Sequence, residues 1–522
     1  MKQLITSAVL LCSTLSGYAD VALHGLFTDN MILQRDIPVA VYGMAEPGEK
    51  VTVTFVGKTK AAIAGKDGAW SVKLDAMKFS ATAAAMTVAG KNTITLNNVL
   101  IGDVWLCSGQ SNMEFSLGQS NRPDDITKAD FPTIRMFHVP GVPAACLRTD
   151  TKFGWGVCTP QAASNFSAVG FYFARKITQE TGVPIGLMKA AWGGTCIEPW
   201  ISYPGLASIP ELAQDKETLD KLIKTYVDTM AGLPAKTAAY VAEARKAISA
   251  NTQVPDPVDL PFYPINGTGP YGWNCLYNGT IHPLTKFGIK GVLWYQGEAN
   301  GGEGETYFQK TRALIGGWRK AWNQGDFPFY LVQLANYEAP NKNPEGGDGW
   351  AKVRMAQLKS LTIPNTGMAV AIDLADADNP RDIHPKNKKD VGERLALWSL
   401  AKDYGKKNLV FSGPLYKSMK VEVAKIRISF DSTGSGLSVG TKKGYDPIVK
   451  DAHGKLQKFA IAGEDKKWVW ADAVIDGKTV LVSSPSVPKP VAVRYAFSMN
   501  PDGCNLYNNE GLPASPFRTD EW

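Results

Sequence analysis

The stretch Trp105-Leu106-Cys107-Ser108-Gly109-Gln110-Ser111-Asn112-Met113 lies where a strand turns into a helix. It continues an apolar, β-prone run, 101–106, that is typical of a short buried strand. The chain turns at Ser108-Gly109, and Ser111 follows the turn. A serine at such a corner is exposed at the carboxyl end of the strand, where its backbone N–H can stabilise an oxyanion. Ser111 is therefore a candidate nucleophile; the alternative is a Ser-Asn turn that caps a helix.

Strands and helices alternate from residue 101 to about residue 404. We expect helices over 165–181, 307–322, 350–361 and 390–402, and strands over 184–191, 289–295, 329–334 and 368–374. This alternation predicts an α/β domain with a parallel sheet and helices on both faces. Between about 205 and 265 the pattern changes to apolar residues at helical spacing, which predicts an inserted helical hairpin closed by the Pro-rich segment 254–264. The hairpin would either cover the sheet or act as a lid.

Two β regions flank the α/β domain. Residues 20–100 contain short β-branched runs, such as Val51 to Phe55, separated by turn signals such as Glu46-Pro47-Gly48, and they predict an N-terminal β-sandwich. Alternating apolar residues return after about residue 405, for example in Ile426 to Phe430. We therefore expect a C-terminal β region over 405–522.

The first residues have the pattern of an export signal. Lys2 precedes an apolar run from Leu4 to Leu15, and small residues at Gly17 and Ala19 fit a cleavage site before Asp20. We expect a signal peptide over 1–19 and an exported protein, periplasmic or secreted. The apolar run is too short to span a membrane stably, and no other segment approaches that length.

Charge and cysteine content exclude some classes of function. The formal net charge of +7 is spread along 522 residues without a long basic run, which argues against a nucleic-acid partner. Six cysteines follow the signal peptide, and Cys146 with Cys158 is the most plausible local disulfide. No Cys or His spacing indicates a metal site, so we expect no bound metal.

A serine nucleophile needs a base and oxyanion donors, and both occur after predicted strands. His384 precedes the last helix of the α/β domain, with Asp382 two residues away to orient it; His282 is the rival base. Oxyanion donors are expected from Ser111 itself, from Gly193 and Gly194, and from the amide of Gln296 or Asn300. The glycines could instead form a tight turn, and Gln296 could be a buried amide with its hydrogen bonds satisfied.

Several separate segments together resemble the sialate O-acetylesterase group of the SGNH (GDSL-like) hydrolases. Four surround the candidate residues, and two lie near the chain ends, so the resemblance covers nearly the whole chain after residue 20. The segments are Gly109-Gln110-Ser111-Asn112-Met113, Trp192-Gly193-Gly194-Thr195, Trp294-Tyr295-Gln296-Gly297-Glu298, Ile383-His384-Pro385, 26–35 and 505–518.

The resemblance implies a flavodoxin-like SGNH hydrolase core without a cofactor. It implies Ser111 as the nucleophile, His384 as the general base, and an oxyanion hole from Ser111, a glycine of Gly193-Gly194 and an amide of the Gln296 segment. Two positions depart from the superfamily. Arg381 stands three residues before the histidine, where an Asp is usual, so Asp382 either completes a triad or the site is a Ser–His dyad. The usual Gly-x-Asn-Asp segment is replaced by 296–300, and we favour Gln296 over Asn300 as the donor.

The expected function is removal of O-acetyl groups from sialic acids, with acetylated xylan or pectin as alternative substrates. We expect Arg381, Asn112, Glu298 and His282 around the substrate, with Arg381 binding the sialate carboxylate unless it pairs with a nearby acidic residue. Two other classes remain. Glu298 and Asp382 could be the two carboxylates of a glycosidase, or the β-sandwiches could form a carbohydrate-binding module.

Overall fold

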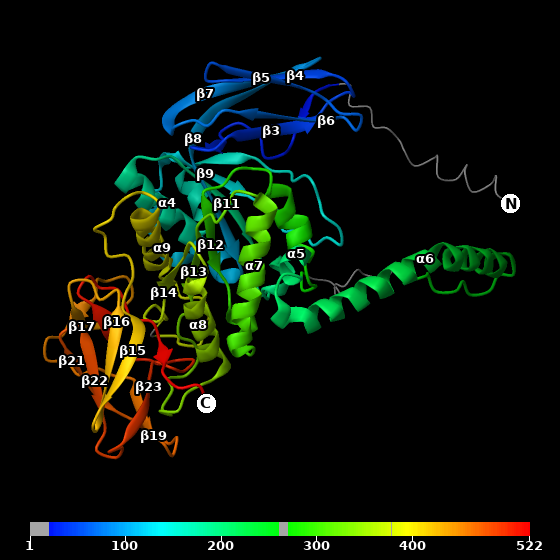
Figure 1. Cartoon of the computed structure of the whole chain (residues 1–522). Coiled ribbons are helices and arrows are strands. Elements are labelled where there is room, and N and C mark those ends of the chain that lie inside the picture. Colours follow the sequence, from blue (N-terminus) through cyan, green and yellow to red (C-terminus); the bar gives the residue numbers. More distant parts are fainter. Residues whose placement is uncertain (1–19, 260–269, 377) are drawn as a thin grey trace.

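The computed structural model describes residues 20–259, 270–376 and 378–522 (Figure 1). The signal peptide expected over 1–19 lies outside these residues. Within them, no helix combines the length and the apolar character needed to cross a membrane.

The centre of the molecule is a parallel sheet, so the α/β prediction is confirmed at this level. Six parallel strands lie in the order β9-β11-β8-β12-β13-β14, and β10 pairs antiparallel with β9 at the edge. The strands are β8 (Thr93–Gly109), β9 (Phe131–His138), β10 (Trp155–Cys158), β11 (Ile185–Ala191), β12 (Gly291–Tyr295), β13 (Phe329–Gln333) and β14 (Thr366–Val370). Every residue of β12 and β13 is buried, as expected for strands covered on both faces.

Helices cover both faces of the sheet (Figure 1), and alternate residues of the strands belong to different apolar cores. Trp105, Leu293 and Tyr330 share one apolar core with α4 (Ala168–Thr181) and α9 (Lys388–Lys402). Their neighbours Leu106, Val292 and Leu331 share the other core with α7 (Tyr307–Trp322) and α8 (Gly349–Lys359). Local signals set the helix ends: the Ser167 hydroxyl accepts a hydrogen bond from the Gly170 N–H, and Gly182 ends α4 at φ +69°.

The strand order reverses direction at β8, and we call this place the switch point of the sheet. After β8 the chain fills one side of the sheet with β9 and β11, and it then crosses to the other side to add β12, β13 and β14. The carboxyl ends of β8, β11 and β12 therefore meet at the place where open α/β sheets bind their ligands.

The N-terminal strands lie in two sheets, and one of them continues into the α/β core through β8. One sheet holds β1 (Ala22–Leu23), β3 (Val39–Met44) and β6 (Ala69–Leu74); β2 (Ile32–Gln34), β4 (Lys50–Phe55), β5 (Lys58–Ile63) and β7 (Ser80–Ala89) join the first half of β8. The domain boundary expected at residue 100 falls inside β8, whose 17 residues pair with β7 at one end and with β11 and β12 at the other. The Arg35 guanidinium reinforces this junction by binding both carboxylate oxygens of Asp103.

The expected helical hairpin is instead one helix, α6 (Ala213–Ser249), that extends away from the body (Figure 1). Pro234 lies inside it without ending it. Both halves are rich in good helix formers, and i,i+4 ion pairs such as Lys216–Asp220 support the first half. Part of the Pro-rich segment, 260–269, lies outside the described residues. Of the residues in α6, Leu219 is buried, so little of this helix covers the sheet.

The C-terminal residues form three further sheets at the opposite end of the α/β region from the N-terminal strands (Figure 1). The first holds β15 (Leu415–Glu422), β16 (Lys425–Asp431), β22 (Thr479–Ser483) and β21 (Asp472–Asp476). The second holds β18 (Val449–Lys450), β17 (Leu437–Thr441) and β24 (Leu506–Asn508), and the third holds β20 (Trp468–Trp470), β19 (Phe459–Gly463), β23 (Pro490–Tyr495) and β25 (Phe517–Arg518).

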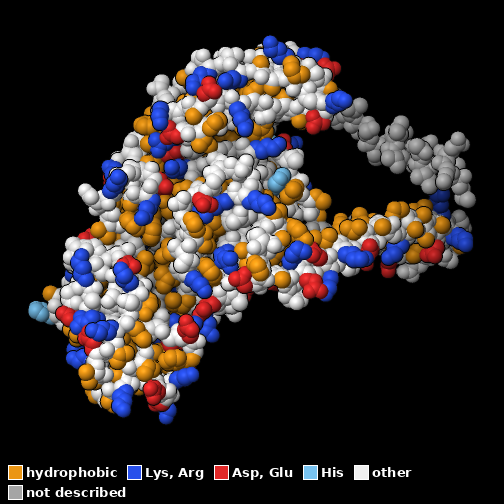
Figure 2. Space-filling model, viewed as in Figure 1, with side chains coloured by type: hydrophobic (Ala, Val, Ile, Leu, Met, Phe, Trp, Pro, Cys, Tyr) orange, Lys and Arg blue, Asp and Glu red, His pale blue; other side chains and the backbone are white. Residues whose placement is uncertain are grey.

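The surface charges and the cysteines can be compared with two expectations from the sequence, namely that there is no long basic patch and that Cys146 and Cys158 form a disulfide. On the face shown in Figure 2, basic and acidic side chains are intermixed and form no continuous basic patch. The expected Cys146–Cys158 disulfide is absent from the described structure, where Cys146 is exposed, Cys158 is buried and both are free thiols.

Candidate active site

The turn after β8 presents Ser111 at the switch point. Gly109 ends the strand at φ +136°, and a Cβ there would lie 2.1 Å from the carbonyl oxygen of Tyr295. Only glycine fits this combination of conformation and close approach. Ser111 then opens the short helix α1 (Ser111–Glu114), and the first N–H groups of a helix have no partner within it. The turn thus exposes both a hydroxyl and a backbone donor.

His384 meets Ser111 from the loop between β14 and α9. Its Nε2 lies 2.8 Å from the Ser111 Oγ, a hydrogen-bond distance that joins residues 273 positions apart in the chain. The ring also stacks on Phe115, with 6.2 Å between centroids. Partial burial lowers the pKa of His384, the positive charge of Lys388 lowers it further, and Asp382 raises it. The imidazole is therefore kept neutral and able to accept a proton near neutral pH.

Asp382 contacts His384 through its main chain more closely than through its ring. The Asp382 Oδ1 accepts a hydrogen bond from the backbone N–H of His384 at 2.9 Å. The same oxygen lies 3.6 Å from the ring Nδ1, which is an ion-pair distance rather than a hydrogen bond. Asp382 thus shapes the loop and supplies negative charge beside the imidazole.

The two glycines after β11 lie against Ser111. A Cβ on Gly193 would be 3.3 Å from the Ser111 Cβ, and the Gly193 N–H donates to Glu114 Oε2 at 2.9 Å. Gly194 has φ +75°, a conformation that favours glycine. An oxyanion at Gly193 would therefore replace the Glu114 carboxylate as the acceptor of this N–H.

The amides of Gln296 and Asn300 are directed at protein acceptors. The Gln296 Nε2 lies within hydrogen-bond distance of Gln110 Oε1, Thr195 O and Asn300 Oδ1. The Asn300 Nδ2 donates to the carboxylates of Glu198 and Glu303. Both side chains are buried and help to hold segment 296–300 beneath the turn, and their role as oxyanion donors stays a prediction.

Asn112 and Glu298 are buried, at 1% and 8% exposure, and their role around the substrate stays a prediction. The Asn112 Nδ2 donates to Glu298 Oε1 at 2.6 Å. Burial raises the pKa of Glu298. The sequence analysis did not include Lys388, whose ammonium completes this cluster by donating to Asn112 Oδ1 at 2.5 Å.

His282 and Arg381 contact groups other than Ser111 and His384. The His282 Nδ1 lies 2.6 Å from the carbonyl oxygen of Arg148. The Arg381 side chain is 75% exposed, and its Nε lies 3.3 Å from Glu338 Oε2. Arg381 thus pairs with an acidic residue, Glu338, which belongs to a different loop.

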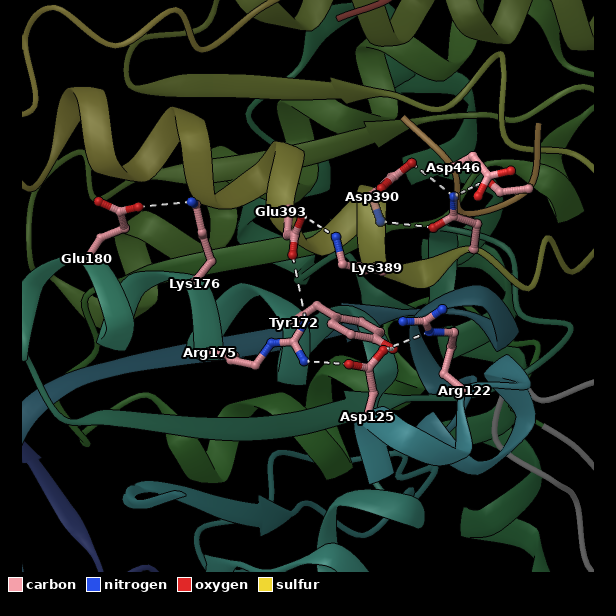
Figure 3. Close-up of polar contacts among 12 residues, drawn as sticks. Arg122, Asp125, Tyr172, Arg175, Lys176, Glu180, Lys389, Asp390, Glu393 and Asp446 are labelled. Carbon is pink, nitrogen blue, oxygen red and sulfur yellow. Dashed lines mark hydrogen bonds and ion pairs between the residues drawn. The ribbon is translucent and has the colours of Figure 1, made fainter. Parts of the chain in front are cut away.

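A loop of the C-terminal region, 442–446, contacts both segments of the site. The Tyr445 hydroxyl, a single donor, lies between the backbone carbonyls of Ser120 and Lys386, within hydrogen-bond distance of both, and the Asn387 Nδ2 donates to the carbonyl of Gly444. Next to it, Asp125 binds Arg122 and Arg175 at 2.8 and 2.9 Å, an arrangement shown in Figure 3. The loops that carry the nucleophile and the base are thereby fastened to the C-terminal sheets.

Comparison with known proteins places these features in a family. Residues 268–400 match the family described as carbohydrate esterase, sialic acid-specific acetylesterase. The chain is 32% identical to sialate O-acetylesterase of Rattus norvegicus, covering 94% of this chain and 93% of the rat protein. For the Homo sapiens enzyme the identity is 30%, over 94% of this chain and 90% of the human protein. The crystal structure of a carbohydrate acetylesterase from Xanthomonas citri superposes with a TM-score of 0.79 at 35% identity, covering 96% of this chain and 100% of that chain. The chain therefore belongs to the sialate O-acetylesterase family.

Proposed function

We propose that this protein is a serine esterase that removes O-acetyl groups from sialic acids by Ser–His acyl transfer. The observation that carries the proposal is the 2.8 Å contact between Ser111 Oγ and His384 Nε2 at the switch point of the sheet. Membership of the sialate O-acetylesterase family supports the choice of ester and sugar.

In the proposed reaction, the Ser111 oxygen attacks the acetyl carbonyl carbon while His384 Nε2 takes the hydroxyl proton. The N–H groups of Ser111, Gly193 and Gly194 bind the oxyanion of the tetrahedral intermediate, and Gly193 exchanges Glu114 for it. The ester bond breaks, and His384 returns the proton to the departing sugar hydroxyl. Water, deprotonated by His384, then attacks the acetyl-serine and releases acetate.

We also propose that the α/β region is the flavodoxin-like core of the SGNH hydrolases. The parallel sheet, the serine directly after its central strand and the histidine directly before α9 support this assignment. A two-carboxylate glycosidase is disfavoured because Glu298 is buried against Asn112, whereas a glycosidase needs both carboxyl groups facing the sugar. A carbohydrate-binding module gives no role to the Ser111–His384 pair.

A substrate panel tests the choice of sugar, because acetylated xylan and pectin remain the alternatives. Acetate release should be fastest, in kcat/KM, from O-acetylated sialic acid, and Ser111→Ala should abolish it on every substrate. Faster release from acetylated xylan or pectin would overturn the sialate assignment, and equal activity in Ser111→Ala would overturn the assignment of Ser111 as the nucleophile.

Arg381 is the proposed partner of the sialate carboxylate, since an exposed ion pair such as Arg381–Glu338 is weak and exchangeable. In the same panel, Arg381→Leu should raise KM for the sialate about tenfold, roughly 1.4 kcal/mol. Turnover of 4-nitrophenyl acetate, which lacks a carboxylate, should stay unchanged. Equal effects on both substrates would contradict this role.

A further inference from the structure

The peptide groups on both sides of His384 are held by two buried side chains. The carbonyl of Ile383, just before the histidine, accepts a hydrogen bond from Asn112 Nδ2 at 3.0 Å. The carbonyl of Pro385, just after it, accepts one from Lys388 Nζ at 2.6 Å. Lys388 also donates to Asn112 Oδ1 at 2.5 Å, which closes the arrangement. Because Asn112 directly follows Ser111, the nucleophile turn and the histidine loop are joined by one side-chain amide.

Lys388 occupies a position that is costly for a lysine. The residue is 0% exposed, and its ammonium lies 4.6 Å from the ring centroid of Phe115 and 5.5 Å from that of Tyr295. A buried ammonium destabilises the fold unless hydrogen bonds, aromatic faces and opposite charge compensate it. Here the two carbonyl acceptors, both rings and the nearby Glu298 carboxyl supply that compensation. A lysine serving only to begin α9 would lie at the surface, as the adjacent Lys389 does in its ion pair with Glu393.

We propose that Lys388 and Asn112 are positioning residues that together hold His384 at hydrogen-bond distance from Ser111. The proposal rests on the proposed Ser–His acyl transfer. Neither side chain needs to touch the substrate. Their effect is exerted through the backbone on either side of the imidazole, and small displacements of a catalytic group cost large factors in rate.

Burial lowers the pKa of Lys388 to about 7, so its ammonium is charged at the lower pH where His384 titrates, and this charge gives the arrangement a second, measurable consequence. The groups facing His384 are Ser111 from α1, Phe115 directly after α1, Asp382 from its own loop, and Lys388 from α9. Among them Lys388 lowers the pKa of His384 and Asp382 raises it. Loss of the ammonium should therefore raise the pKa of His384, so that the histidine becomes protonated, and inactive as a base, at a higher pH.

The test compares Lys388→Met with the matched control Lys389→Met on the same turn of α9. Thermal unfolding first checks that each variant is folded. Lys388→Met should lower kcat at least tenfold with KM changed less than about threefold, and it should move the acid limb of the kcat/KM profile to higher pH. Lys389→Met should do neither. The double variant with Asn112→Ser should lose little more than Lys388→Met alone, because the two residues form one unit.

Measurements on the Lys388 and Asn112 variants can overturn the proposal. A folded Lys388→Met enzyme with wild-type kcat and an unshifted acid limb would overturn it. If Lys388→Met does not fold, Asn112→Ser tests the same link, and a wild-type kcat there would also overturn it. An NMR titration of the His384 imidazole reads its pKa without turnover. A higher pKa of His384 in Lys388→Met supports the proposal, and an unchanged pKa overturns it. This readout holds even if Ser111→Ala stays active and the proposed function fails.

Discussion

The proposed reaction depends on the imidazole of His384, and the neighbouring groups determine its pKa. Burial and Lys388 lower its pKa, and Asp382 opposes them from 3.6 Å. The net direction is downward from the usual value of 6.5. Because the base must be neutral, the acid limb of kcat/KM should lie below that pH, and activity should persist into mildly acidic solution.

Asp382→Asn tests the charge on the other side of the ring. The amide oxygen can still accept the His384 N–H, so the loop should keep its shape, but the negative charge is lost. The pKa of His384 should fall and the acid limb should move to lower pH, opposite to the shift in Lys388→Met. We expect a loss of about tenfold in kcat, roughly 1.4 kcal/mol. A loss of about 10⁴-fold would instead indicate a full triad in which Asp382 fixes the tautomer.

At this scale the sequence was most informative about the nucleophile and the base and least informative about their supports. Ser111 and His384 were selected from position and resemblance, and the structure brings them into contact. Lys388 gave no signal, because a lysine in the first turn of a helix is usually exposed. Gln296 was expected to donate to an oxyanion. In the structure its Nε2 lies within hydrogen-bond distance of oxygens of Gln110, Thr195 and Asn300, which the sequence alone cannot place beside it.

The element that positions Ser111 is the turn between β8 and α1. Gly109→Ala should destabilise it, since the residue would need φ +136° and would place its Cβ 2.1 Å from the Tyr295 oxygen. We expect a loss of about 3 kcal/mol or more in the free energy of unfolding, together with most of the esterase activity. Chemical denaturation and acetate release measure the two effects.

Gly477→Ala is the matched control, because Gly477 also has positive φ, at +60°, but an added Cβ there meets no atom within 4 Å. It should cost only about 1 kcal/mol and leave activity unchanged. Equal effects of the two substitutions would contradict a special role for the close approach at Gly109.

Elements with a regular apolar period were predictable, and those sustained by distant contacts were not. The expected helix 307–322 coincides with α7 (Tyr307–Trp322). Strand β9 was not expected, because Pro132 and Arg135 interrupt its apolar pattern. Arg135 is tolerated there since its guanidinium lies within hydrogen-bond distance of the side-chain oxygens of Asn30 and Asn98 in the N-terminal region. The two apolar segments expected to form a hairpin belong to one continuous helix, α6, in which Pro234 lies among good helix formers.

Across the whole molecule, the flanking β regions support the α/β core at specific points. Arg354 is fully buried and donates to Leu334 and Ala335 at the end of β13 and to Ser498 and Met499 in the C-terminal region. Two segments that resemble the family also lie at such junctions. Segment 26–35 binds Asp103 through Arg35, and segment 505–518 reaches Gln333 through Ser515. The sequence showed that these segments belong to the family pattern but could not show that they join domains.

Tyr445→Phe tests whether the C-terminal region supports the active site. The substitution keeps the ring, over which the Arg122 guanidinium lies at 4.9 Å, and removes the hydroxyl that joins the carbonyls of Ser120 and Lys386. Losing the one hydrogen bond that this hydroxyl can donate should lower the free energy of unfolding by about 1 kcal/mol. The kcat should fall about fivefold, because Lys386 lies two residues from His384.

Tyr203→Phe is the control for this prediction, since it removes a hydroxyl that donates to Asp220 on α6. It should leave kcat unchanged. If Tyr445→Phe loses stability but keeps full kcat, the C-terminal loop supports only the fold and not the geometry of the histidine.

The central claim is that Ser111 and His384 act as one catalytic unit, and a double-mutant comparison tests it most directly. Acetate release from O-acetylated sialic acid is measured for Ser111→Ala, His384→Ala and the double variant, with thermal unfolding as the check on folding. We predict that each single substitution lowers kcat by about 10³-fold or more and that the double variant loses little beyond either one. Wild-type turnover in Ser111→Ala, or losses that multiply in the double variant, would contradict the claim.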